Sequence, residues 1–209
     1  MKKKWCMLGF LVAVASGYAS AWTLDNTASS LAFATVKASD IGESHRFKSI
    51  SGMVSSDGEV AIEIDLASVD TGIPIRDERM GEHLFQVIQF PTAQFNTSIN
   101  LDDVGSISLG GAKTLAVQGE LIVGTSRLKL AFDVLVWRLA DQSMVVSTVQ
   151  PVIVNAASLN LVSGVEKLRE IAGLPSISKA VPVTFSLTFR LNGQNPITSS
   201  APPGVGGAI

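Results

Sequence analysis

The sequence has very few of the residues that enzymes and metal proteins use for chemistry. It contains one cysteine, Cys6, and two histidines, His45 and His83, which lie far apart along the chain. It has no His-Glu-x-x-His motif, no Gly-x-Ser-x-Gly motif and no glycine-rich phosphate loop or dinucleotide fingerprint. These absences argue against a metalloenzyme, a serine hydrolase and a nucleotide-dependent enzyme. We therefore predict no catalytic residues, no metal site and no cofactor.

Long apolar runs are also missing. The longest N-terminal run, Trp5–Ala15, is much shorter than the roughly 18 apolar residues that span a bilayer. It follows three lysines and precedes the small residues Ala19-Ser20-Ala21, which is typical of a cleaved secretory signal. We predict a signal peptide over residues 1–21, a mature protein that starts at Trp22, and periplasmic localisation with no stable membrane insertion after cleavage.

Cleavage changes the charge and removes the only thiol. All three charges of the signal are lysines, so 13 Lys+Arg and 18 Asp+Glu remain, a net charge of −5. Nucleic-acid-binding domains have a basic footprint instead, so a nucleic-acid partner is not expected. Cys6 leaves with the signal, and the exported domain therefore has no disulfide.

Apolar and polar residues alternate along most of the mature chain. In the clearest run, Val60, Ile62, Ile64 and Leu66 face one way and acidic residues face the other, which indicates a half-buried strand. We expect residues 39–46, which are mostly polar, to interrupt the strands. Pro151 suggests an edge strand or a bulge within the run Met144–Val154. The predicted strands are Ser29–Ala38, Phe47–Val54, Glu59–Leu66, Thr92–Asn100, Lys113–Val123, Arg127–Trp137, Met144–Val154 and Val183–Arg190.

About eight strands with local hairpins favour an all-β, eight-stranded antiparallel barrel, because closure removes exposed sheet edges. Helical spacing over Ser163–Ala172 predicts one short helix that covers a barrel end. The mature domain is predicted to span residues 22–191. Residues 192–209 are rich in Gly, Pro and Ser and have no periodic face, so we expect a disordered tail.

One stretch, Ser68–Pro91, departs from this pattern. Charged residues crowd there between apolar flanks, and we interpret it as a crossover that caps or gates the barrel. Arg76 and Arg79 are candidates for contact with a ligand head group, because Arg offers a fork of donors. The favoured interpretation is nevertheless a short exposed helix whose charged residues pair with each other, and the two histidines are expected at the surface.

Several segments in order also resemble the YceI-like family. They are Trp22-Thr23-Leu24-Asp25, Ser30-Leu31-Ala32-Phe33, Ile62–Gly72, Arg76-Asp77, Leu84-Phe85, Phe90–Phe95 and Gly119-Glu120-Leu121. The resemblance implies a lipocalin-like extended antiparallel barrel, export to the periplasm, and an elongated apolar pocket for a polyisoprenoid or other long-chain lipid. The chain departs from the family pattern at Ala38, where many members have His, and over Leu168–Phe185.

The interior of an eight-stranded barrel is either filled by side chains or encloses one ligand. Alternation alone does not separate these cases, and the resemblance favours a lined pocket. The candidate lining residues are Phe33, Ile62, Ile64, Phe95, Leu121, Phe132, Val134, Phe185 and Phe189. The first hypothesis is therefore a lipid carrier. The alternative is a filled barrel that docks on a membrane or redox partner through Arg76–His83, and an enzyme is the weakest candidate. The oligomeric state stays open, a dimer included.

Overall fold

Antiparallel strands account for most of residues 20–192, the part of the chain that the computed structural model describes. Residues 1–19 and 193–209, which hold most of the predicted signal peptide and tail, lie outside this range. The strands are β1 (Ser20–Leu24), β2 (Ser30–Lys37), β3 (Ile41–Phe47), β4 (Ile50–Ser55), β5 (Glu59–Asp65), β6 (Val69–Asp70), β7 (Thr92–Ser98), β8 (Ala112–Val123), β9 (Ser126–Arg138), β10 (Met144–Thr148), β11 (Val152–Asn155) and β12 (Ala180–Leu191).

Helical segments in the described range are short. Four are single turns or π-helical: η1 (Asn26–Ala28), η2 (Leu66–Ser68), η3 (Met80–Phe85) and η4 (Ala156–Leu159). The α-helices are α1 (Pro74–Arg79), α2 (Leu101–Gly105) and α3 (Val162–Ile171). Helix α3 matches the predicted helix to within one residue at each end, and no helix among residues 20–192 has the length and apolar character needed to cross a bilayer.

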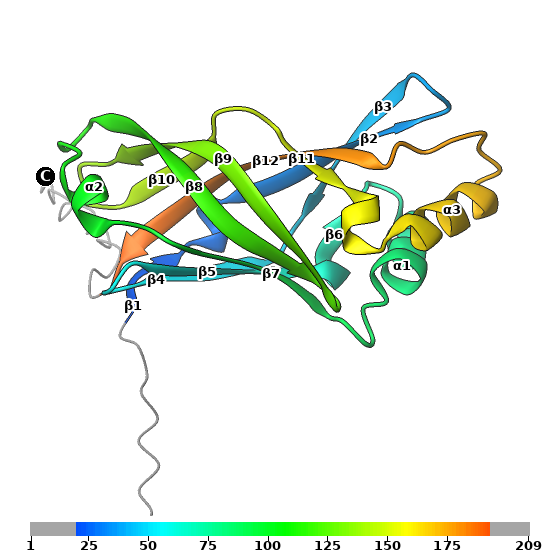
Figure 1. Cartoon of the computed structure of the whole chain (residues 1–209), viewed down its shortest axis with the longest axis horizontal. Coiled ribbons are helices and arrows are strands. Elements are labelled where there is room, and N and C mark those ends of the chain that lie inside the picture. The colour runs from blue at the N-terminus through cyan, green and yellow to red at the C-terminus, as the bar shows by residue number, and fades with distance from the viewer. Residues whose placement is uncertain (1–19, 193–209) are drawn as a thin grey trace, which may run out of the picture.

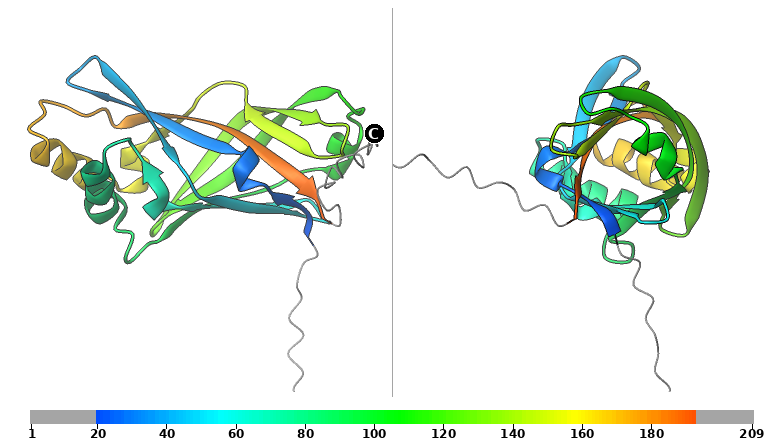
Figure 2. Two further views of the ribbon diagram at one scale, coloured as in Figure 1. Left: turned by 180° about the vertical axis from the view of Figure 1, so that it is seen from behind. Right: turned by 90° about the vertical axis from the view of Figure 1, so that its left-hand side faces the viewer.

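Eight of the strands close into a barrel. The order is β1-β4-β5-β7-β8-β9-β10-β12, and β12 pairs with β1 to complete the ring. Every pair is antiparallel, and the longest ladder is the β8–β9 hairpin, from Ala112↔Trp137 to Val123↔Ser126. The view along the barrel shows this ring with helices behind it (Figure 2). The predicted eight-stranded antiparallel barrel is confirmed.

The remaining strands extend the barrel at one end. The C-terminal end of β12 pairs with β1, and its middle part pairs with β2. β2 in turn pairs with β3, and β3 pairs with β6. β11 pairs with the start of β12 on its other side. The β2–β3 hairpin therefore projects beyond the ring, beside α1 and α3, while α2 lies at the opposite end (Figure 1).

Two strand predictions were wrong in their bounds. Residues 41–46, predicted as a polar break, belong to β3, and the predicted strand Phe47–Val54 is divided between the end of β3 and β4. The polar residues of β3 are compatible with a strand because it lies in the extension and pairs with β2 along its whole length. Met144–Val154 is likewise two strands, separated around Pro151, which has no N–H for a ladder.

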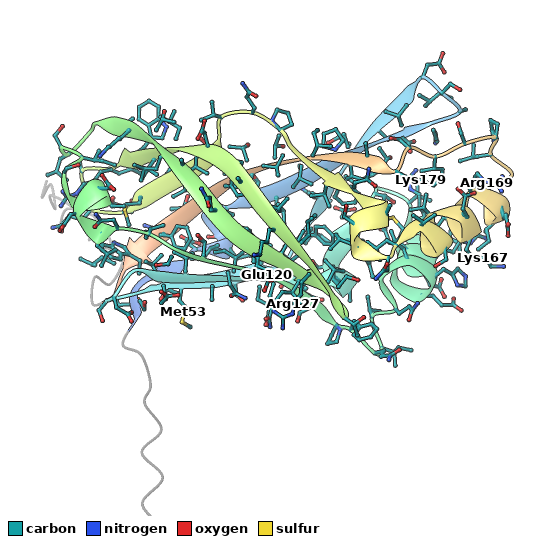
Figure 3. All side chains as sticks on the ribbon, viewed as in Figure 1. Met53, Glu120, Arg127, Lys167, Arg169 and Lys179 are labelled. Atoms are coloured by element: carbon teal, nitrogen blue, oxygen red, sulfur yellow. The ribbon has the colours of Figure 1, made fainter. Side chains whose placement is uncertain are left out.

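Several ion pairs lie on the outer surface of the molecule. Arg127 and Glu120 meet on the outer face of the β8–β9 hairpin at 2.6 Å (Figure 3). Glu166 on α3 accepts from Arg169 at 2.6 Å and from Lys179 at 2.8 Å. The second pair links α3 to the residue just before β12, so the helix is held against the extended end of the barrel.

The described structure extends slightly beyond both predicted ends of the domain, residues 22 and 191. β1 begins at Ser20, but its pairing with β12 uses Trp22, Thr23 and Leu24, which follow the predicted cleavage point. At the other end, Asn192 accepts a hydrogen bond from the Thr23 hydroxyl at 2.7 Å, so the first residue of the predicted tail still contacts the barrel.

Candidate functional site

The barrel encloses a continuous apolar cavity of about 530 Å³. Its lining reaches from Val104 on α2 to Val165 and Leu168 on α3, so it runs between the two ends of the molecule. All nine residues that were predicted to line a pocket do line it: Phe33, Ile62, Ile64, Phe95, Leu121, Phe132, Val134, Phe185 and Phe189. The volume lies within the 300–1,000 Å³ that is typical of ligand pockets.

The inward face of each strand is apolar because the side-chain period is two. In β5, Val60, Ile62 and Ile64 line the cavity, and Ala61 and Glu63, which alternate with them, are exposed. Three rings from different strands follow each other across the interior. Phe95 lies 5.7 Å from Phe132, and Phe132 lies 6.0 Å from Phe185, measured between ring centroids. These side chains point inward and still retain partial exposure, because they face the cavity.

A filled barrel would instead bury large side chains completely. Among the described residues no large side chain is fully buried, and inward-facing rings such as Phe95 and Phe132 are only partly buried. The barrel is therefore hollow, which is the geometry of the carrier hypothesis and not that of the docking alternative.

One end of the cavity, beside α1, is polar. The carboxylate of Glu43 accepts from Lys37 Nζ at 2.8 Å and from Arg76 Nη1 at 2.8 Å. Nε2 of His45 lies 3.9 Å from the same carboxylate and 3.1 Å from the Thr35 hydroxyl. All five residues line the cavity. The two basic side chains lower the pKa of Glu43, the Lys37 hydrogen bond most strongly, so this carboxylate is ionised.

His45 was predicted to be a surface histidine, and this prediction was wrong. Its side chain is only 4% exposed, and its ring lies 5.3 Å from that of Phe33. Burial lowers its pKa below 6.5, and the positive charge of Arg76 adds to the effect. Within the described part of the chain, Nδ1 of His45 has no hydrogen-bond partner.

Arg76 and Arg79, the predicted head-group contacts, both line the cavity from α1. The favoured interpretation, a helix whose charges pair with each other, was wrong for Arg76. Its Nη1 donates to Glu43 on β3, its Nη2 donates to the Thr71 carbonyl at 2.7 Å, and its buried Nε has no partner among residues 20–192. Asp77 accepts from the Thr71 N–H at 2.9 Å and does not pair with Arg76.

Sequence reasoning missed Lys37, Glu43 and His45 as site residues. They lie on the β2–β3 hairpin, and its second strand was not predicted because it has few apolar residues. A period of two was nevertheless present, since Glu43, His45 and Phe47 share one face of β3. Within residues 20–192, no group of three or more His, Cys, Asp or Glu side chains is arranged to hold a metal ion.

Comparison with known proteins identifies relatives of this fold. The family model of the YceI-like domain matches residues 22–189. A solved structure described as a polyisoprenoid-binding domain from Saccharophagus degradans, implicated in plant cell wall breakdown, superposes with a TM-score of 0.81 at 34% identity. The match covers 83% of this chain and 99% of that one. No curated protein matches the chain.

Two more distant structures share the fold alone. BcnA of Burkholderia cenocepacia superposes with a TM-score of 0.62 at 19% identity, over 79% of this chain and 98% of that one. A YceI protein of Campylobacter jejuni has a TM-score of 0.51 at 14% identity, over 69% of this chain and 82% of that one. The barrel is thus kept where most of the sequence differs.

Proposed function

The chain belongs to the YceI-like domain family, and on that premise we propose that it is a periplasmic carrier for a polyisoprenoid or other long-chain lipid. The lipid lies inside the barrel and is bound without being chemically changed. The continuous apolar cavity of about 530 Å³ is the observation that supports this proposal most strongly. The relative from Saccharophagus degradans, described as polyisoprenoid-binding, supports the same ligand class.

The cavity suits a long chain for two physical reasons. A strand as long as β9, with 13 residues, extends roughly 43 Å at about 3.3 Å per residue, so even a tilted barrel is deep. Each buried CH₂ group contributes about 0.8 kcal/mol of transfer free energy. A lipid tail therefore binds through the hydrophobic effect alone, and a longer tail binds more tightly until the cavity is full.

The N-terminal sequence supports the periplasmic part of the proposal. The basic start, the short apolar run and the small residues before Trp22 are those of a secretory signal. A lipid carrier is useful in that compartment, because a long-chain lipid has very low solubility in the water between two membranes. The barrel replaces that water with apolar side chains.

A chain-length series tests the proposal. Titration with polyprenols of increasing length should give affinity that rises with length and then levels off. Val117→Trp places a large ring in the cavity, and it should weaken binding of the longest polyprenol at least tenfold. Ala116→Trp introduces the same ring at the neighbouring, exposed position of β8, and this variant should bind as the unmodified protein does. Equal affinity of both variants, or no uptake of any polyprenol, would contradict the proposal.

A further inference from the structure

The polar end of the cavity differs from the rest of its lining. Residues Thr35, Lys37, Glu43, His45 and Arg76 gather there, while the remaining wall is almost entirely apolar. A bare hydrocarbon would need no such group. The following inference rests on the proposed function, and it concerns the part of the ligand that lies at this end.

Two buried nitrogen atoms at this end have no hydrogen-bond partner in the described chain, Nδ1 of His45 and Nε of Arg76. Nε of arginine is always a donor. We assign the ring proton of His45 to Nδ1, with Nε2 accepting from the Thr35 hydroxyl 3.1 Å away, and in this tautomer Nδ1 is a donor as well. A buried donor without an acceptor raises the free energy of the folded protein. A ligand that places an acceptor atom beside these donors would remove that cost.

The charges at this end favour a neutral acceptor over an anion. Lys37 and Arg76 are both already paired with Glu43, and the ionised carboxylate lies only 3.9 Å from Nε2 of His45. Asp77 is a second carboxylate that acts on His45, so the two negative charges near the ring balance the two positive ones and leave no net positive charge to attract an anionic head group. Arg79 lines the same cavity and has no ion pair among the described residues. An anionic head group would therefore have to pair with Arg79.

We propose that His45 and Arg76 form a head-group subsite for a neutral acceptor oxygen, such as a carbonyl, of a lipid whose tail extends toward α2. Glu43 acts as a positioning residue, because it holds Arg76 through Nη1 and leaves Nε for the ligand. The β2–β3 hairpin and α1 thus recognise the head group, and the barrel holds the tail.

Three probes of similar chain length test the subsite: methyl palmitate with a neutral carbonyl, heptadecane with no head group, and hexadecyl phosphate with an anion. Affinities are measured by equilibrium exchange from cyclodextrin. We expect methyl palmitate to bind about tenfold more tightly than heptadecane, the order of magnitude that one or two hydrogen bonds contribute, and more tightly than hexadecyl phosphate. Equal affinity for the ester and the alkane, or tightest binding of the phosphate, overturns the subsite but not the carrier. Failure of all three probes overturns both.

Two substitutions at position 45 locate the donor. The amide of His45→Gln reaches the position of Nε2, so it keeps the Thr35 contact and lacks a donor at Nδ1. The shorter His45→Asn places its amide near Nδ1. The tenfold ester preference should be lost in the first variant and largely kept in the second, with His83→Gln, outside the cavity lining, as the matched control. Loss in both variants, or in neither, contradicts the role of Nδ1. If a variant fails to fold, the three probes on the unmodified protein still decide.

Discussion

His45 remains neutral because burial removes the water that would stabilise a charged imidazole, and because Arg76 would repel that charge. The carboxylates of Glu43 and Asp77 act in the opposite direction, and Lys37 reinforces Arg76. Burial has the largest effect of the five. A neutral ring can donate from one nitrogen and accept at the other, which is what the proposed subsite needs.

This lowered pKa makes stability depend on pH. Between its folded pKa and 6.5, His45 binds a proton in the unfolded chain but not in the folded one, so the free energy of unfolding is highest above pH 6.5 and falls as the pH decreases below it. Urea unfolding between pH 8 and pH 5 measures this slope. His45→Gln should show a shallower decline than the unmodified protein, and His83→Gln should not differ in this way. Parallel declines for the unmodified protein and His45→Gln would show that burial does not hold this ring neutral.

Among the elements, the regular strands could be predicted from alternation, whereas the strand that completes the site could not. β5, β7, β8 and β9 have a clear apolar face, and their predicted inward residues line the cavity. β3 has a polar inward face because it forms the end of the cavity that contacts charged groups. Its polar residues are therefore typical of a loop. The ion pair between Glu43 and Arg76 joins β3 to α1, and these two elements come together only when the complete fold has formed.

The close contact between α3 and η3 closes the same end of the barrel. A Cβ atom at Gly164 would lie 2.8 Å from the His83 carbonyl oxygen and 2.8 Å from Cα of Leu84, both backbone atoms that cannot rotate away. We predict that Gly164→Ala destabilises the protein by about 1–3 kcal/mol, the usual cost of overpacking. Urea unfolding measures this effect.

Gly105→Ala is the matched control for that change. Gly105 ends α2, and a Cβ atom there would meet nothing within 4 Å, so the same substitution should leave stability unchanged or raise it slightly. If the two variants unfold at the same urea concentration, the helix and the π-helix do not pack as closely as this geometry requires.

For the molecule as a whole, the eight-stranded ring could be predicted from the strand pattern, whereas the lined interior was expected from the family resemblance alone and not from alternation. Alternation reports which way Phe95 or Phe132 points, and it does not report how far apart the opposite walls lie. The distance between walls depends on strand tilt and register, which are properties of the closed ring. Apolar side chains that line a cavity lack packing partners on that side, so a ligand that fills the cavity should also stabilise the fold.

Lipid analysis tests the carrier most directly. The protein is purified without detergent from the cells that make it, extracted with organic solvent, and the extract is examined by mass spectrometry. We predict close to one long-chain lipid per protein, with an isoprenoid or other extended apolar tail, and depletion of that lipid in Val117→Trp but not in Ala116→Trp. An extract without such a lipid, together with no uptake of polyprenols or acyl chains by the purified protein, would contradict the proposal that this barrel carries lipid.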